Sequence, residues 1–311
     1  DNLGDEAMLH TAIQVLRDSG LVSNISVSSC SPEKIQNFHN VSGSNLLLPG
    51  NIIRNLKSFN FSALRESFRF IRSTNALVFA GGSILNDKKG YKDLLVILYK
   101  SLFYRLLGKR VIFWGVAFDQ PSSRIGGFLL ALIIKLALLI VFRDEKSKIL
   151  ASELSSNRGQ IKSGVDILFS LLPWVARLNL VSAKKEHKHY QIGLSLRPYP
   201  PNKGCDVEKL DDLLCEQVIH YLKNLSQSYD LEITPLIFSD GEGQKNDRVM
   251  IERVEKALPA ISFKWPEVEI RRCKAGGFAS LLEQYFGYIA ELDLVVGERF
   301  HSLVLAQMLE I

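Results

Sequence analysis

Residues Leu292–Ser302 read LDLVVGERFHS, and this stretch decides the fold because a single glycine separates a strand pattern from a helix pattern. The apolar run before Gly297 predicts a buried strand, and the segment after it predicts a helix. Arg299 and His301 therefore fall at the carboxyl edge of a sheet, where open α/β sheets bind ligands. An arginine and a histidine at such an edge suit an anionic substrate that needs a charge clamp and a proton donor.

Two more arginines occupy the same position in the pattern. Arg143 directly follows the apolar run Leu138–Phe142, and Arg197 directly follows the run Ile192–Leu196. Guanidinium groups bind carboxylate and phosphate oxygens in pairs, so a convergent set of arginines predicts a site for a multiply charged small anion. Structural roles are the alternative. Arg143 would be neutralised by the two acidic residues after it, Arg299 would pair with the adjacent Glu298, and His301 would be a core or capping residue.

Two loops are further candidates for the same site. The strand-like run Ala76–Ala80 leads into Gly81–Ser83, where paired glycines let backbone N–H groups approach an anion. The chain opens on a loop, Asn2–Ala7, that runs into a helix. Asp5 stands in the first turn of that helix, and a favourable interaction with the helix dipole would by itself explain the residue.

The set of motifs, in this order and spacing, resembles the polysaccharide pyruvyl transferase family from Asp1 to Ile311. The resemblance rests on Asn2–Ala7, Gly81–Ser83 with Asp87, Arg143–Glu145 with Ser147, Arg197, and Gly297–His301. It implies a fold similar to the two-domain GT-B glycosyltransferases. It also implies transfer of a pyruvyl group from phosphoenolpyruvate to a pair of sugar hydroxyls, which forms a cyclic ketal in cell-surface polysaccharide biosynthesis.

The resemblance implies functional roles for Asp87, Arg197, Arg299 and His301, and the patterns described above add the other candidates. The expected catalytic residues are His301, which would protonate the enol carbon, and Asp87, which would orient or deprotonate the attacking hydroxyl. The expected substrate-binding residues are Arg197, Arg299, Arg143, Gly81, Gly82, Ser83, Gly4 and Asp5. The chain departs from the family pattern at Ala80, where a third glycine is common, and at Phe300 and Ser302. We expect phosphoenolpyruvate as donor, a sugar or lipid-linked oligosaccharide as acceptor, and no metal or redox cofactor.

Composition narrows the class of protein. The 311 residues suffice for two domains, and a hydrophobic content of 47% with 23% charged residues is typical of a globular protein. A net charge of +5 without a basic stripe argues against a nucleic-acid partner. Nucleotide-binding glycine motifs are absent from the sequence. The four cysteines are scattered, which favours a reducing cytosol over a disulfide or zinc framework.

One apolar segment resembles a membrane-spanning helix in its hydrophobic composition. Gly127–Phe142 is shorter than the roughly 20 residues that a spanning helix needs, and Lys135 lies at its centre. The pattern favours a helix that turns into a core strand near Lys135. The expected location is cytoplasmic, and contact of this apolar helix with the inner face of the membrane is the alternative that remains open.

Alternating strand and helix patterns predict an α/β protein with two doubly wound, Rossmann-like parallel-sheet domains that face a cleft. The first domain is expected at 1–178, a linker at 179–190 and the second domain at 191–311. The expected strands of the second domain are Ile192–Leu196, Leu231–Phe238, Glu269–Arg272 and Leu292–Val296. The resemblance further implies a fragment that lacks the first strand and the end of the second domain. Arg143 would face Arg197, Arg299 and His301 across the cleft.

Two other functions remain open at this stage. A glycosyltransferase that uses a sugar nucleotide would have the same fold, and assays with each donor would separate the two. An inactive glycan-binding relative is the other alternative, although the charged motifs argue against it.

Overall fold

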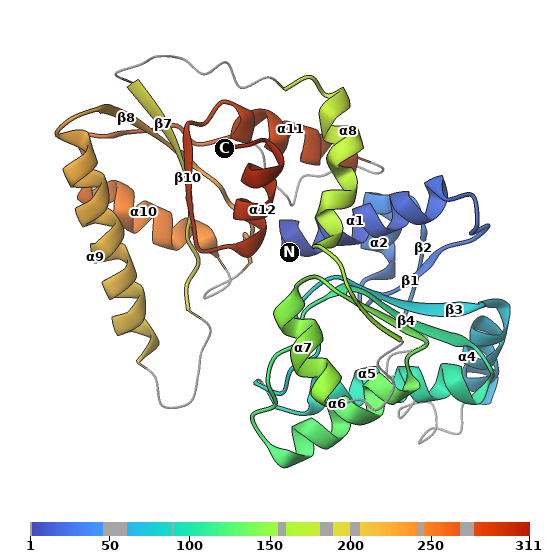
Figure 1. Ribbon diagram of the computed structural model, residues 1–311. Coiled ribbons are helices and arrows are strands. Elements are labelled where there is room, and N and C mark those ends of the chain that lie inside the picture. Colours follow the sequence, from blue (N-terminus) through green and yellow to red (C-terminus); the bar gives the residue numbers. More distant parts are fainter. Residues whose placement is uncertain are drawn as a thin grey trace. The chain divides into compact units, whose positions relative to one another are not determined.

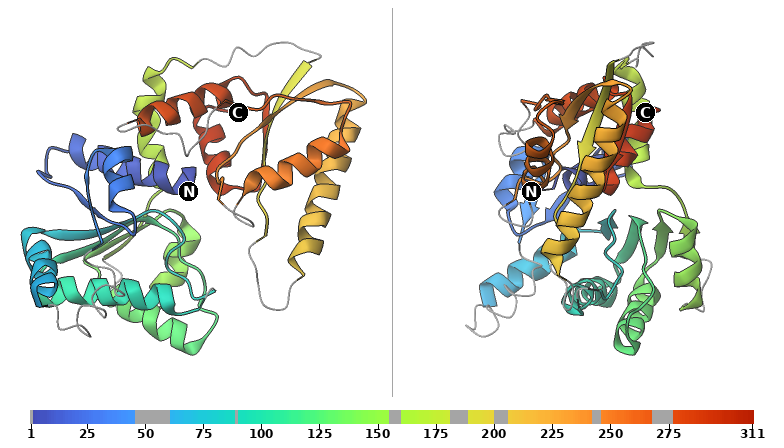
Figure 2. Two further views of the ribbon diagram at one scale, coloured as in Figure 1. Left: turned by 180° about the vertical axis from the view of Figure 1, so that it is seen from behind. Right: turned by 90° about the vertical axis from the view of Figure 1, so that its left-hand side faces the viewer.

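The computed structural model describes residues 2–45, 61–88, 90–154, 160–180, 189–199, 206–241, 246–267 and 277–311. The chain divides into two compact units. Unit 1 comprises Asp1–Ala7 with Leu168–Ile311, and unit 2 comprises Met8–Ile167. Each unit contains its own four-stranded parallel sheet (Figures 1 and 2).

Unit 2 is built on the sheet β3-β4-β5-β6, whose strands follow one another in chain order. These strands are β3 (Ala76–Ala80), β4 (Arg110–Val116), β5 (Leu139–Phe142) and β6 (Ile161–Ser163). The helices of this part are α4 (Phe61–Ser73), α5 (Lys92–Leu106), α6 (Arg124–Leu136) and α7 (Glu145–Glu153). Helices α5 and α6 lie side by side along one face of the sheet (Figure 1). They bury apolar side chains such as Leu94 and Ile133 against Phe113 of the central strand.

A smaller layer completes unit 2. Strands β1 (Ser26–Ser28) and β2 (Ser42–Ser44) pair in parallel, and α2 (Pro32–His39) connects them. The long helix α1 (Leu3–Asp18) starts in unit 1 and continues into unit 2, where its Ile13 packs with Ile35 and Val41.

Unit 1 contains the sheet β10-β7-β8-β9, in which the strand order reverses at β7. Its strands are β7 (His189–Ser195), β8 (Asp230–Pro235), β9 (Ser262–Phe263) and β10 (Leu294–Gly297). Its helices are α8 (Leu172–Arg177), α9 (Val207–Ser226), α10 (Asp247–Ala257), α11 (Phe278–Ala290) and α12 (Phe300–Met308), and a 3-10 turn, η2 (Ile167–Leu171), precedes them. The α9–α10 pair covers one face, and the α11–α12 pair covers the other (Figure 1). The reversal makes the carboxyl ends of β7 and β10 the topological switch point of the sheet.

These sheets confirm the expected α/β class with parallel strands. The reversed strand order of a doubly wound sheet is found in unit 1, whereas the described strands of unit 2 run in chain order. The apolar segment Gly127–Phe142 forms α6 and then β5, as the pattern predicts. Among the described helices, none is both long enough and apolar enough to cross a membrane. The strand expected at Glu269–Arg272 lies outside the described residues.

The division into units differs from the expected limits at 178 and 191. Unit 1 starts at Leu168, and it also includes the start of the chain. The reason is local packing: Leu3 is fully buried, its N–H donates to the Phe238 carbonyl at 2.7 Å, and Asn2 forms an antiparallel bridge with Ser239. Trp174 of α8 also contacts the ring of Phe286 in the same unit. Most of the expected linker, 181–188, lies outside the described residues.

Candidate active site

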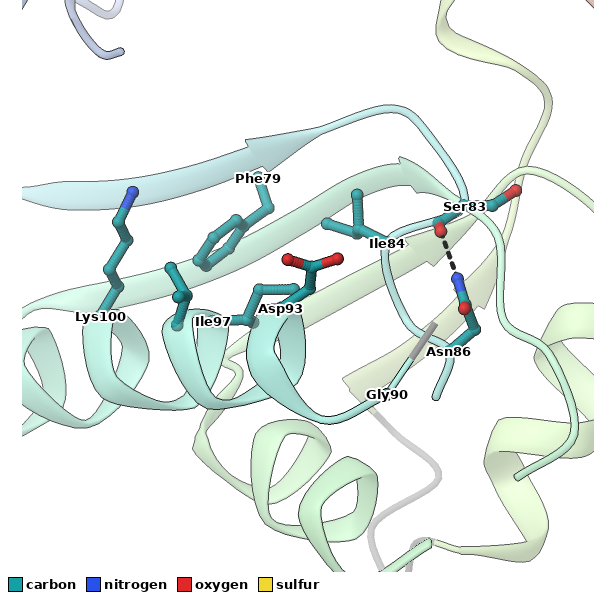
Figure 3. A pocket seen from close by; sticks show the side chains of 9 residues that line it. Phe79, Ser83, Ile84, Asn86, Gly90, Asp93, Ile97 and Lys100 are labelled. Atoms are coloured by element: carbon teal, nitrogen blue, oxygen red, sulfur yellow. Dashed lines mark hydrogen bonds between the residues drawn. The ribbon is translucent and has the colours of Figure 1, made fainter. Parts of the chain in front are cut away.

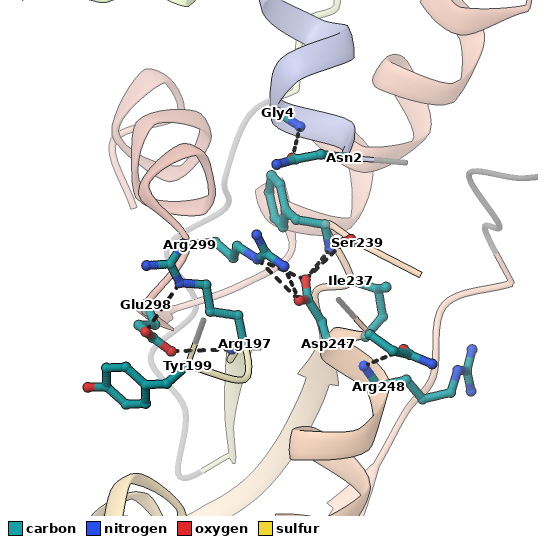
Figure 4. A network of polar contacts seen from close by, with 12 residues as sticks. Asn2, Gly4, Arg197, Tyr199, Ile237, Ser239, Asp247, Arg248, Glu298 and Arg299 are labelled. Carbon is teal, nitrogen blue, oxygen red and sulfur yellow. Dashed lines mark hydrogen bonds and ion pairs between the residues drawn. The ribbon is translucent and has the colours of Figure 1, made fainter. Parts of the chain in front are cut away.

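Two of the predicted arginines meet at the switch point of the unit 1 sheet. Arg197 lies two residues beyond β7, and Arg299 lies two residues beyond β10. These strands are neighbours: Gly297 pairs with Ser195, and the Glu298 N–H donates to the Ser195 carbonyl at 2.8 Å. The sheet register therefore brings both arginines to one edge, in a polar network that Figure 4 shows.

Arg299 is held by a buried carboxylate, Asp247, at the start of α10. The Asp247 side chain is 0% exposed, and the Arg299 side chain is 15% exposed. The Arg299 Nε lies 3.1 Å from both carboxylate oxygens, and Nη2 also donates to Oδ1. Backbone N–H groups of Phe238 and Ser239 donate to Oδ2 at 3.0 and 2.9 Å. Burial raises the pKa of Asp247, while Arg299 and these N–H groups oppose the rise.

Arg197 is held more loosely, by Glu298. Its Nε lies 3.3 Å from Oε1, and its backbone N–H donates to Oε2 at 3.3 Å. The Arg197 side chain is 42% exposed, and its Nη1 and Nη2 donate to none of the described residues. The sequence suggested an ion pair between Arg299 and Glu298. Instead, Glu298 pairs with Arg197, and Arg299 pairs with Asp247. Each arginine takes a carboxylate from another segment of the chain.

His301 lies against the first turn of α1. A Cβ atom on Gly4 would collide with Nδ1 of the His301 ring, so only glycine allows this close approach. The Gly4 N–H donates to Oδ1 of Asn2 at 3.0 Å, and the ring of Phe300 meets the imidazole edge-on at 5.4 Å. Gly4, which was expected in the first domain, therefore lies beside His301 in unit 1.

Asp5 completes this cluster. Part of the residue is exposed, and desolvation of its carboxyl by the surrounding chain raises the pKa of that carboxyl. The charges of His301 and Arg299 oppose this rise, which indicates that both lie within electrostatic range of the carboxyl. Carboxyls with perturbed pKa values cluster at functional sites.

The remaining predicted residues belong to unit 2, starting with the turn after β3. Gly81 and Gly82 have φ angles of 69° and 80°, in the left-handed region that favours glycine. The Gly81 N–H donates to the Trp114 carbonyl at 2.7 Å, and the Gly82 carbonyl accepts from the Ala117 N–H at 2.9 Å. A Cβ on Gly81 would also collide with Met8. Local geometry therefore already requires both glycines.

Arg143 follows β5 and reaches across the edge of the unit 2 sheet. Its Nη2 donates to Oγ of Ser83 at 3.1 Å, and its Nη1 lies 3.5 Å from Oδ2 of the buried Asp166. Asp144 is farther away, with 3.9 Å between its Oδ2 and the arginine Nε. Asp144 instead caps α7, where its Oδ1 accepts from the Ser147 N–H at 2.7 Å.

Asp87 anchors the loop before α6. Its Oδ1 accepts from the Ser122 N–H at 2.8 Å, and its Oδ2 accepts from the hydroxyl of Ser123 at 2.9 Å. Ser123 in turn caps α6. Burial by itself would raise the pKa of Asp87, but these hydrogen bonds outweigh burial and lower it. A carboxylate with a lowered pKa and two engaged oxygens is a weak base.

A pocket of about 320 Å³ opens beside the turn Gly81–Ser83, between β3 and α5 (Figure 3). Phe79, Ile84 and Ile97 form its apolar part. Ser83 lies at one end and Lys100 at the other, where the Lys100 Nζ donates to the Ser28 hydroxyl at 3.0 Å. Burial lowers the pKa of Lys100. The pocket thus has the Lys100 ammonium at one end, the Ser83 hydroxyl at the other and the Asp93 carboxylate between them.

The structure therefore sorts the ten predicted residues into two groups. Unit 1 brings together Gly4, Asp5, Arg197, Arg299 and His301, whereas unit 2 contains Gly81, Gly82, Ser83, Asp87 and Arg143. The expectation that both groups form one site stays a prediction. Sequence reasoning missed Asp247, because an acidic residue at a helix start resembles an ordinary dipole partner.

Comparison with known proteins gives the family. The family model of polysaccharide pyruvyl transferases matches residues 2–311. The chain belongs to this family. A search of curated proteins found no match. Among solved structures, the chain is similar to Anabaena HepE in complex with UDP and glucose, with 11% identity and a TM-score of 0.36. The match covers 80% of this chain and 60% of HepE, so the chain spans less than two thirds of that protein.

Proposed function

We propose that this family member transfers a pyruvyl group from phosphoenolpyruvate to two hydroxyls of a sugar, free or lipid-linked, and forms a cyclic ketal. The observation that supports this most is the cluster of Arg197, Arg299, His301 and Asp5 in unit 1. This cluster combines cationic donors, an acid and a base at the switch point of a parallel sheet, where such folds bind ligands.

Donor binding falls mainly to Arg197. Phosphoenolpyruvate has a phosphate and a carboxylate, and each can accept two parallel hydrogen bonds from one guanidinium group. Arg197 offers Nη1 and Nη2, because only its Nε is engaged by Glu298. Arg299 offers Nη1, since Nε and Nη2 donate to Asp247. Within each ion pair the carboxylate balances the charge of the arginine, so the bound donor would keep negative charge near His301, the residue that we assign as the acid.

The proposed reaction has three steps. His301 gives a proton to the methylene carbon of the donor, which becomes a methyl group and leaves an oxocarbenium centre. The first sugar hydroxyl adds to this centre and loses its proton to a base. Phosphate then leaves with its bonding electrons, and the second hydroxyl adds and closes the ring. The proton of the second hydroxyl passes to the departing phosphate or to water, so no oxidant or reductant is needed.

We assign the base to Asp5 rather than to Asp87. The pKa of Asp5 is raised by burial, and the carboxyl lies in electrostatic range of His301. The pKa of Asp87 is lowered, and both its oxygens already accept hydrogen bonds. A general base works best with a pKa closer to the working pH, which favours Asp5. Asp87 then has the role of holding the loop before α6.

The test is to incubate the protein with phosphoenolpyruvate and candidate sugars, measuring phosphate release and a mass gain of the sugar equal to pyruvic acid less one water. His301→Gln keeps a hydrogen-bonding side chain but cannot transfer the proton. We expect it to bind the donor normally while turnover falls by roughly 10²–10⁴ fold. His189→Gln is the matched control, because His189 pairs with Asp230 at the opposite end of β7 and should keep full activity.

Three results would contradict the proposal. Unchanged turnover in His301→Gln would remove the assigned acid. Loss of donor binding with intact turnover per bound donor would make His301 a phosphate ligand instead. Transfer from a sugar nucleotide, with no reaction of phosphoenolpyruvate, would place the protein among glycosyltransferases.

A further inference from the structure

The outer surface of helices α4, α5 and α6 in unit 2 exposes large apolar side chains. Leu106 is 74% exposed, Phe128 63% and Ile125 59%. Three further residues, Leu95, Leu102 and Phe68, are also exposed. We call these six side chains, with the exposed charged residues of the same three helices, the helical surface.

Helix periodicity places the apolar residues on the outward sides of their helices. Leu95, Leu102 and Leu106 are spaced by seven and four residues, so they share one side of α5. The residues on another side of α5, such as Leu94 and Ile97, are buried in the core. In α6 the exposed Ile125 and Phe128 are likewise three residues apart, whereas Leu130, Ile133 and Ile134 face the core.

The three helices are neighbours in unit 2. Helix α5 packs against α6, and the hydroxyl of Tyr91 donates to the Ser123 Oγ at 2.9 Å where both helices begin. Helix α4 joins α5 through the rings of Phe68 and Phe103, whose centroids are 5.6 Å apart. These six exposed apolar side chains therefore lie on neighbouring helices, while Leu21, Leu138, Ile149 and Val165 are exposed elsewhere in unit 2.

This surface is also strongly cationic. Among the described residues of the three helices, the exposed basic side chains are Arg65, Arg69, Arg72, Lys92, Arg105, Arg124 and Lys135. The exposed acidic side chains are Glu66 and Asp93. Seven basic and two acidic side chains leave a surplus of five positive charges on these helices. The helices that expose the six apolar side chains are thus also basic.

We propose that the helical surface binds the face of a lipid bilayer that contains anionic lipids. Exposed apolar side chains together with arginine and lysine are typical of helices that lie in the membrane interface. The basic groups attract lipid phosphates, and the leucines and phenylalanines enter the headgroup boundary. A nucleic acid would attract the cations but would leave the leucines without a role. A second copy is disfavoured, since two surfaces of equal positive charge repel each other.

The proposal concerns binding alone and does not depend on the chemistry in unit 1. If the proposed function also holds, a protein on the membrane would meet a lipid-linked acceptor at high local concentration. The binding test uses neither donor nor acceptor, so its result is independent of whether the protein transfers pyruvyl groups.

The experiment measures co-sedimentation of the full chain with vesicles of phosphatidylcholine, with and without an equal share of phosphatidylglycerol. We expect binding to the anionic vesicles, weakening as salt rises. The first test variant replaces three cations of the helical surface by glutamate: Arg105→Glu, Arg124→Glu, Lys135→Glu. Each cation lost near the membrane should weaken binding about fivefold, so the triple variant should bind at least about 100-fold more weakly. The double variant Ile125→Ser, Phe128→Ser should bind at least about tenfold more weakly, because it removes two insertable side chains.

The matched control reverses three exposed lysines of unit 1: Lys209→Glu, Lys223→Glu, Lys256→Glu. It changes the net charge by the same amount and should keep its vesicle binding within about twofold, because these lysines lie outside the surface. An equal loss in this control would overturn the proposal, since net charge alone would then explain binding. Absence of wild-type binding would overturn it too. So would a dimer that Phe128→Ser dissociates, because the surface would then bind a second copy.

Discussion

Arg197 and Arg299 follow neighbouring strands of the same sheet, yet the structure holds them in opposite ways. Arg299 is nearly buried and shares two of its nitrogens with Asp247, which is itself fixed by two backbone N–H groups. Arg197 is about half exposed and touches Glu298 only through Nε and its backbone N–H. The first arginine is therefore part of the framework of unit 1, and the second is available to a ligand.

The difference teaches how one sequence pattern leads to two roles. A buried charge costs several kcal/mol unless a partner compensates it, so removing either Arg299 or Asp247 should destabilise the unit. An exposed arginine needs no such partner and keeps its planar group for an incoming anion. The comparison predicts that variants of Arg299 lose stability first, whereas variants of Arg197 lose donor binding first.

The largest expected effect is on the stability of unit 1. Arg299→Ala leaves Asp247 buried without its cation and should lower the free energy of unfolding of this unit by roughly 3–5 kcal/mol. Denaturation followed by tryptophan fluorescence can isolate unit 1, because Trp114→Phe leaves the only tryptophans, Trp174 and Trp265, in that unit.

The control for this prediction is Arg253→Ala, which breaks the more exposed pair with Asp212. Such pairs contribute about 0–1 kcal/mol, so a small change is expected there. If Arg299→Ala were as mild as this control, the contrast between the two arginines would be lost.

A second prediction concerns a buried ionisable group in unit 2. Arg299 is buried as a charged group with an opposite charge beside it, whereas His10 is buried in its neutral form. His10 and His39 are both buried, and their ring centroids are 5.9 Å apart. Burial, then the charges of His39 and Arg17, lower the pKa of His10 from 6.5 to about 4. The folded state therefore keeps His10 neutral at a pH where the unfolded state binds a proton, and unit 2 should lose about 3 kcal/mol of stability between pH 6.5 and 4.

This loss is measured as the free energy of unfolding at several pH values, with Trp174→Phe and Trp265→Phe leaving Trp114 to report on unit 2. The variant His10→Gln should flatten the pH dependence. His220→Gln, at an exposed histidine of unit 1, should not. An unchanged pH dependence in His10→Gln would show that His10 is not the group that titrates.

A third prediction concerns the approach of His301 to α1. Gly4→Ala adds a Cβ that would collide with the imidazole, so the ring or the helix must shift. We expect a loss of roughly 1–3 kcal/mol in the stability of unit 1 and a lower turnover, because the ring leaves its position. Gly287→Ala in α11 is the control, since a Cβ there meets no atom within 4 Å. Normal turnover in Gly4→Ala would show that catalysis does not depend on the position of the His301 ring.

The smallest effect on stability is expected for Arg197→Lys, at no more than about 1 kcal/mol. A lysine keeps the charge but not the planar group that binds two oxygens at once. The substitution should remove one hydrogen bond to a charged group, which contributes about 1.5–3 kcal/mol. Donor affinity should therefore fall by roughly 10–100 fold. Calorimetric titration with phosphoenolpyruvate measures this, with Arg177→Lys as an exposed control. Unchanged affinity would show that Arg197 does not bind the donor.

The local pattern of apolar residues in the sequence was sufficient to predict several strands, helices and residue positions of this protein. The period of apolar residues indicates β7, β10 and the passage from α6 to β5, because buried strands and helices must repeat apolar side chains at their own spacing. The position of Arg197 and Arg299 after such runs predicts that both lie at the carboxyl edge of a sheet. Neighbouring strands are also expected to align there, as Gly297 and Ser195 do.

Only the tertiary structure decided how these side chains are used. The partner of Arg299 is 52 residues away in sequence, and the partner of Arg197 is 101 residues away. Gly4 meets His301 from the other end of the chain. Sequence spacing contains no information about such distant pairs, because they depend on strand order and on where α1 begins. The sequence by itself determined which residues could bind an anion. The fold decided which of them are already neutralised, because burial makes an opposite charge necessary for one arginine and leaves the other exposed.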